Sequence, residues 1–138
     1  MKKFIFSIAL FSFAFFACDK EPNPTKTIDL NEAFTLAINQ TAELSTDGMK
    51  ITLLDITEDS RCPTNVECIW AGRVVAEFKV EKGDESFIRS LTDNPANDAA
   101  LSTSFEAFGH LVNFVEATPY PDGSTIDKDD YLVKIIIE

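Results

Sequence analysis

Basic and histidine side chains are scarce in this sequence. Its 138 residues include twelve Lys and Arg against twenty-three Asp and Glu, for a net charge of −11, and a single histidine, His110. Phosphate binding needs a dense Lys and Arg surface, so we expect no nucleic-acid partner. The apolar content of 45% nevertheless supports a packed core, and the length is that of one domain.

Recognisable catalytic patterns are also missing. The sequence has no G-x-S-x-G nucleophile motif, and His110, next to Gly109, is typical of a surface or capping residue rather than a base. The acidic stretch 122–130 lacks the register of an EF-hand loop and has Lys128 near its end, which favours a solvated turn over a calcium site. We therefore expect no catalytic residue, no metal and no cofactor.

Helical periodicity is absent after residue 26, and alternation of apolar with polar residues predicts strands instead. The alternating segments are 34–38, 49–56, 74–81, 87–91, 111–117 and 131–137. The second changes phase between Leu53 and Leu54, which predicts a bulge or burial on both faces. The last is apolar enough that we expect partners on both of its edges. The chain is thus predicted to be all-β, a single β-sandwich or partly closed barrel of about seven antiparallel strands.

Residues 92–104 are small and polar and predict a long loop, a place where function often lies. Leu101 and Phe105, at its end, are the apolar side chains there that would anchor the loop in a partner's cleft.

The first seventeen residues differ from the rest of the chain. Six of the twelve Phe lie between Phe4 and Phe16, behind the basic pair Lys2-Lys3. A basic start followed by a short apolar run is typical of a secretory signal. The fourteen residues 4–17 are fewer than the roughly 20 that a spanning helix needs, so a permanent membrane helix is not expected.

The apolar run ends in Phe15-Phe16-Ala17-Cys18, which resembles the lipobox of bacterial lipoproteins, with Phe15 in the place of the usual Leu. The resemblance implies a signal peptide at 1–17 and an acylated Cys18 that anchors the chain to the membrane. The alternative is an ordinary signal peptide with an unrelated Cys. Residues 18–27 then form a hydrophilic tether to a β-sandwich domain at 28–138. In some bacterial groups acidic residues directly after the lipidated Cys direct a lipoprotein onward to the cell surface, and Asp19 and Glu21 resemble that pattern.

Two cysteines remain beyond the anchor, Cys62 and Cys68. Exported proteins meet oxidising conditions, where an even pair of neighbouring cysteines is normally a disulfide. Zinc would need about four ligands, and the one histidine is distant. The spacing also differs from the C-x-x-C of a redox pair. Among these readings the sequence favours a structural disulfide that closes a small loop.

The stretch Asp59–Gly72, DSRCPTNVECIWAG, resembles a motif of small secreted or lipid-anchored bacterial proteins, many from Bacteroidetes-type organisms, which share D-S-R-C-P, a second Cys and W-A-G. The similarity extends loosely to the strand at Phe34, the turn at Pro119-Tyr120-Pro121 and the last strand. It implies a fold and a location in the cell envelope, and no activity.

Four residues around this motif are candidates for a site: Asp59, Arg61, Trp70 and Arg73. In one interpretation they form a ligand patch, aromatic plus guanidinium, for a sugar ring or an acidic peptide end. In the favoured one they are a folding staple, in which Asp59 pairs with Arg61 or Arg61 binds loop carbonyls, and Trp70 packs on the disulfide. Ala71-Gly72 would permit a close backbone approach or a bulge.

The sequence thus predicts a lipid-anchored domain at the outer membrane, on its periplasmic face or at the cell surface. Its expected role is that of a non-catalytic binding or structural module with an envelope protein or a glycan as partner. An inhibitor or accessory subunit of an envelope enzyme is the first alternative. A small carboxylate-dependent hydrolase is the second.

Overall fold

A computed structural model describes residues 24–96 and 98–138 of the chain. The expected signal peptide and lipidation site, Cys18, lie outside these described residues. Nine strands and one 3-10 turn occur in the described part: β1 Lys26–Ile28, β2 Ala33–Ala37, β3 Thr41–Leu44, β4 Lys50–Asp59, β5 Val74–Lys82, β6 Glu85–Thr92, β7 Ser104–Ala107, β8 His110–Thr118, η1 Lys128–Asp130 and β9 Leu132–Ile137.

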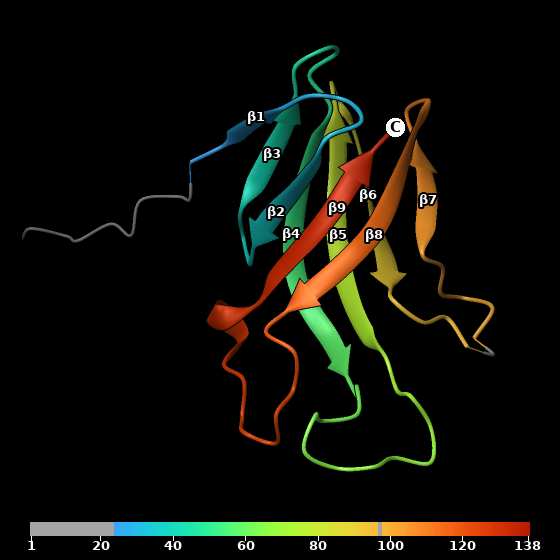
Figure 1. The fold of residues 1–138 in the computed structure, drawn as a ribbon. Coiled ribbons are helices and arrows are strands. Elements are labelled where there is room, and N and C mark those ends of the chain that lie inside the picture. Colours follow the sequence, from blue (N-terminus) through green and yellow to red (C-terminus); the bar gives the residue numbers. More distant parts are fainter. Residues whose placement is uncertain (1–23, 97) are drawn as a thin grey trace, which may run out of the picture.

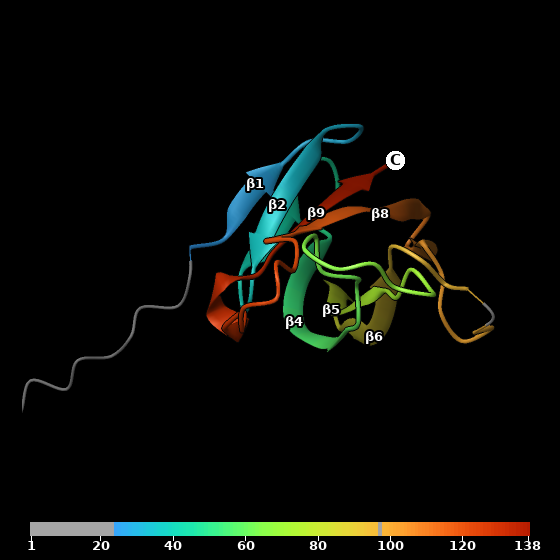
Figure 2. The same ribbon diagram turned by 60° about the horizontal axis from the view of Figure 1, so that its bottom comes forward.

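The strands form two sheets that pack face to face, as predicted for an all-β sandwich. One sheet has the order β1-β3-β4-β5-β6 and the other β2-β9-β8-β7. Figure 1 shows the second sheet in front of the first, and Figure 2 shows β8 and β9 lying over β4, β5 and β6. The fold class is confirmed as a sandwich, whereas the count of about seven strands was too low.

The prediction of antiparallel pairing holds for all but one of the described strand pairs. β1 pairs with β3 in parallel, through Lys26–Ala42, Thr27–Glu43 and Ile28–Leu44. β1 begins at Lys26. The last two residues of the predicted tether, 26 and 27, therefore belong to the first sheet. The first sheet therefore starts almost directly after the proline-containing segment.

Other strand-level predictions are confirmed. β9 lies between β2 and β8, so the apolar last strand has partners on both edges. The change of phase in β4 coincides with a register shift against β5 between Leu53 and Asp55, that is, with a bulge. A bulge moves successive side chains to opposite faces, which is why the alternation breaks there.

The core lies between the sheets and is made by the alternating apolar positions of both inner faces. Its fully buried members include Leu53, Phe78 and Val80 from the first sheet and Leu36, Val133 and Ile135 from the second. In the described residues no helix is long and apolar enough to cross a membrane.

The two ends of the sandwich differ. At the lower end in Figure 1, β4 ends at Asp59 and β5 begins at Val74, joined by a long loop. The segment 119–131, between β8 and β9, lies at the same end. β1 and β3 lie toward the other end. The motif of the sequence therefore sits where strands of both sheets terminate.

Candidate functional site

The Arg61 side chain is buried where β4 ends, although it carries a full charge. Only 5% of the residue is exposed. Its Nε and Nη2 donate to the two carboxylate oxygens of Asp59 at 2.8 and 2.6 Å. Nη1 donates to the Ala117 carbonyl at 2.6 Å, and Nη2 donates to the Pro119 carbonyl at 2.9 Å. The ring of Tyr120 lies over the guanidinium, 4.9 Å from it.

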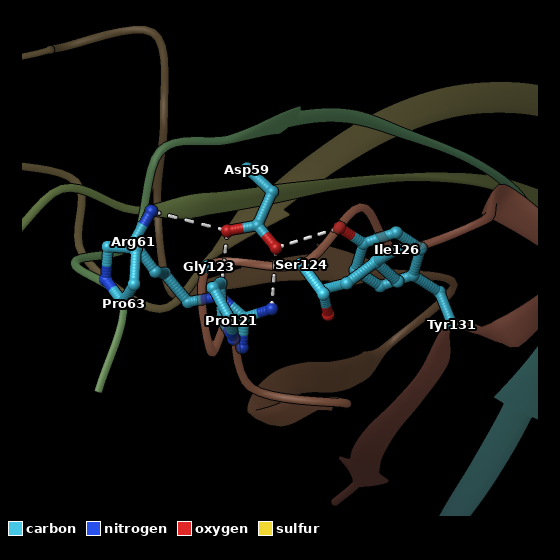
Figure 3. Close-up of a pocket in the computed structure, with 8 residues that line it drawn as sticks. All are labelled: Asp59, Arg61, Pro63, Pro121, Gly123, Ser124, Ile126 and Tyr131. Atoms are coloured by element: carbon cyan, nitrogen blue, oxygen red, sulfur yellow. Dashed lines mark hydrogen bonds and ion pairs between the residues drawn. The ribbon is translucent and has the colours of Figure 1, made fainter. Parts of the chain in front are cut away.

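Asp59 is the second half of this pair and receives further donors. The Tyr131 hydroxyl donates to its Oδ2 at 2.8 Å, and the backbone N–H of Arg61 donates to its Oδ1. Figure 3 shows the carboxylate between Arg61 and Tyr131. Burial opposes ionisation of Asp59, but the hydrogen bonds from Arg61 and Tyr131 outweigh it and lower its pKa. Burial and the bond to Asp59 raise the pKa of Tyr131 to about 12.

The Asp59–Arg61 pair joins the two sheets. Asp59 and Arg61 come from the end of β4 in the first sheet, while Ala117 belongs to β8 and Tyr131 precedes β9 in the second. Every guanidinium nitrogen of Arg61 is hydrogen-bonded within the protein, as the staple interpretation expects for these two residues. Removing one partner of such a buried pair typically costs about 3–5 kcal/mol.

A hollow of about 310 Å³ opens beside this pair. Its walls come from the motif and from the segment 121–131. The lining residues are Asp59, Arg61, Pro63, Pro121, Gly123, Ser124, Ile126 and Tyr131 (Figure 3). The charges at its floor already neutralise one another.

The loop 62–72, here called the disulfide loop, is closed by a disulfide and by backbone contacts where its two ends meet. Cys62 is bonded to Cys68, as predicted, with their Cα atoms 5.9 Å apart. The Ser60 N–H donates to the Arg73 carbonyl at 2.8 Å. Gly72 has φ +65°, and a Cβ there would lie 1.8 Å from the Ser60 carbonyl oxygen. Only glycine fits this approach, which confirms the reading of Ala71-Gly72 as a close backbone contact.

The prediction that Trp70 packs on the disulfide and buries a large apolar area was wrong. Trp70 is 74% exposed, Ile69 is 94% exposed and Val66 is 54% exposed. The physical reason is the closure at Ser60 and Gly72. It makes the disulfide loop project beyond the end of the sandwich, where no core is within reach of these side chains.

Arg73 and Trp70 belong to a second hollow, so the four candidate residues are divided between two places. Arg73 donates through Nε to both oxygens of Glu58 at 3.1 Å and lies 3.4 Å from Asp98. The hydrogen bond from Arg73 lowers the pKa of Glu58. This hollow of about 300 Å³, here called the Trp70 hollow, is lined by Glu58, Ser60, Trp70, Ala71, Gly72, Arg73, Asn94 and Ala96.

The loop between β6 and β7 does not present the apolar anchors suggested for an inhibitor. Phe105 lies in β7 and its ring packs edge to face against Phe87, with the centroids 6.5 Å apart. Leu101 is half-buried. Asp98 of this loop forms an ion pair with Arg73, which lines the Trp70 hollow.

An ion cluster that the sequence did not reveal lies at the other end of the sandwich. Asp47 Oδ2 lies 2.6 Å from Lys82 Nζ and 2.9 Å from His110 Nε2. The bond from Lys82 holds the pKa of Asp47 well below its ordinary value. His110 therefore ties the start of β8 to the turn between β3 and β4. The three residues are distant in the sequence, so no local pattern pointed to them.

In the part of the chain that the structure describes, no group of three or more His, Cys, Asp or Glu side chains is placed to hold a metal ion. No family model, curated protein or solved structure matches the chain.

We predict that Asp59→Asn destabilises the protein by about 3–5 kcal/mol at neutral pH, because it leaves the Arg61 charge buried without its counterion. The variant should also lose less of its free energy of unfolding than the wild type does when the pH falls below about 4. The pKa of Asp59 is below its ordinary 3.8 in the folded state, so the unfolded chain takes up the proton first. This part of the stability is therefore present above about pH 4 and lost as the pH falls further.

Urea unfolding of the wild type and the variant at pH 7, 5, 4 and 3 measures both effects. Glu58→Gln is the matched control, because Glu58 pairs with an arginine at the surface; it should lose much less stability. Equal losses for the two variants would contradict the role given to Asp59.

Proposed function

We propose that this protein is a non-catalytic binding module of the cell envelope whose contact surface is the disulfide loop with the adjoining Trp70 hollow. The single observation that carries the proposal is the exposure of Trp70 on a segment whose backbone is fixed. The disulfide, the Gly72 contact and the Asp59–Arg61 pair hold both ends of that segment.

The energetic reasoning concerns apolar surface left in water. Trp70, Ile69 and Val66 are neighbours on one short loop, and large apolar groups gathered on a surface typically mark an interaction site. A flexible loop would lose conformational entropy when bound. A loop already held in place loses little, so more of the contact energy appears as affinity.

The carboxyl groups near the loop support binding over catalysis. A general acid for glycoside hydrolysis needs a raised pKa, so that it holds its proton at neutral pH. Asp59 and Glu58, which line the two hollows, both have a lowered pKa because arginine hydrogen bonds favour their charged forms. The hydrolase alternative is therefore the least supported.

The envelope location rests on the lipobox-like end of the signal peptide and on the resemblance of DSRCPTNVECIWAG to lipid-anchored proteins. With an acylated Cys18, residues 18–25 reach at most about 30 Å when extended. β4 spans about 33 Å at its usual rise, and the disulfide loop follows its far end (Figure 1). A tether that enters at β1 would thus leave the loop free to face a partner away from the bilayer.

An inhibitor or accessory subunit of an envelope enzyme is the second candidate. Ile69 is the observation that favours it, since an almost fully exposed aliphatic side chain on a closed loop fits the way rigid inhibitors fill a cleft. In this version the disulfide loop, and not the loop between β6 and β7, enters the partner.

Site-specific photocrosslinking in the native host tests the proposal. A benzophenone amino acid replaces Ile69 in one variant and Ile88 in the other. Both residues are exposed isoleucines, and Ile88 lies on β6 away from the loop. Since benzophenone inserts into C–H bonds of proteins and glycans alike, we expect a discrete adduct from position 69 that position 88 does not give. Identical adducts, or none from position 69, would contradict the proposal.

Lipid anchoring is tested separately. Metabolic labelling with a fatty acid should mark the wild-type chain and leave Cys18→Ala unlabelled, because the acyl chains require the Cys18 thiol and amine. The labelled wild type should fractionate with the outer membrane. Equal labelling of both chains would contradict lipid anchoring at Cys18. It would not affect the proposal that the disulfide loop is a contact surface.

A further inference from the structure

The Trp70 hollow has the features of a small ligand site rather than of a bare apolar patch. It holds about 300 Å³, the lower end of the range for ligand pockets. Trp70, which is 74% exposed, lines it together with Ala71, Gly72 and Ala96. The other lining residues carry polar side chains: Glu58, Ser60, Arg73 and Asn94. An aromatic face and several hydrogen-bonding groups thus converge on one space.

The polar groups of this hollow are held in position before any ligand arrives. Glu58 accepts from Arg73 at 3.1 Å and from the Ser60 hydroxyl at 2.9 Å. The Asn94 side chain donates to the Gly72 carbonyl at 3.1 Å and accepts from the Ala96 N–H. Such preorganisation reduces the entropy lost on binding.

Both partners of the ion pair retain hydrogen-bonding capacity for a ligand. A guanidinium has five N–H groups, more than the contacts to Glu58 and Asp98 occupy, and a carboxylate has about four acceptor positions. The hollow therefore offers donors and acceptors side by side. Hydroxyl groups, which both donate and accept, match this mixture better than groups that do only one.

The charges of the hollow disfavour an anionic ligand. Arg73 is flanked by Glu58 at 3.0 Å and by Asp98 at 3.4 Å, so two carboxylates face one guanidinium. An anion would meet these carboxylates and a chain of net charge −11. A neutral hydroxylated ligand avoids this repulsion and uses both the donors of Arg73 and the acceptors of Glu58, whereas an ammonium cation brings no acceptor for Arg73.

We infer that the Trp70 hollow binds one ring of a neutral glycan, a pyranose whose C–H face stacks on the Trp70 indole while its hydroxyls bond to Arg73, Glu58 and Asn94. The C–H hydrogens are slightly positive and the face of the indole is negative, so the two surfaces attract. Rings with equatorial hydroxyls, as in β-linked glucose and N-acetylglucosamine, present the flattest such face. This inference rests on the proposed function and names its ligand.

Trp70 is the only tryptophan of the chain, so its fluorescence reports on this site alone. The full chain with Cys18→Ala, which lacks the acyl group, is titrated with cellotetraose and with the tetramer of N-acetylglucosamine. We expect a saturable change in emission, with at least threefold protection from acrylamide quenching, and a dissociation constant on the order of 1 mM or below. The anionic tetramer of galacturonic acid should bind at least tenfold more weakly.

Variants separate stacking from hydrogen bonding. Arg73→Lys keeps the charge and loses the planar fork, so binding should weaken at least fivefold in calorimetry. Trp70→Ala should abolish detectable binding, and Ile88→Ala should leave it unchanged. Circular dichroism and urea unfolding verify that each variant is folded.

The outcomes also distinguish this inference from the proposed function. Absence of any response to both neutral tetramers overturns the glycan inference, and an adduct from position 69 would then still support a binding module with a protein partner. A response to tetramethylammonium in place of the sugars overturns it in favour of a cation site. Equal affinity for the neutral and anionic tetramers would contradict the inference that the ligand is a neutral glycan.

Discussion

A buried ion pair between Arg61 and Asp59 determines the geometry of the end of the sandwich that carries the disulfide loop. Both charged groups are largely withdrawn from water, with side chains 3% (Arg61) and 9% (Asp59) exposed, so each depends on the other and on the carbonyls and hydroxyl around it. Those partners come from β8 and from the residue before β9, so the pair fixes one sheet to the other. A sandwich whose sheets are fixed in this way can support a long loop at the same end without letting it collapse onto the core.

The exposed position of Trp70 follows from that constraint. The base of the disulfide loop is held by Ser60 and Gly72, and no side chain other than hydrogen fits at position 72. The loop therefore extends outward, and its apolar side chains remain in water in the isolated protein. The Trp70 hollow forms on the Arg73 side of this base, so the staple at Arg61 and the proposed binding site at Arg73 lie at two separate places.

The sequence predicted the sandwich because its longer strands alternate clearly, as in the Val74–Lys82 strand β5 and in β9. It did not predict β1, β3 or β7, since three or four residues carry too little periodicity to separate a strand from a loop. The Asp59–Arg61 pair was within reach of sequence reasoning because the residues are neighbours. The contacts of this pair with the Tyr131 hydroxyl and the Ala117 carbonyl could not be predicted, because those residues are distant in the sequence. The burial predicted for Trp70 was wrong because the backbone contact between Ser60 and Gly72, and not the hydrophobicity of the side chain, decides its exposure.

Backbone order parameters of residues 62–72 from nitrogen-15 relaxation test most directly whether the ion pair holds the loop. In the wild type we predict values near 0.85, those of a rigid backbone. In Arg61→Met, with the disulfide intact, they should fall below about 0.6 for residues 69–72, while the strands keep their order. Values below 0.6 already in the wild type, or an unchanged loop in Arg61→Met, would contradict the claim that this pair presents Trp70 to a ligand.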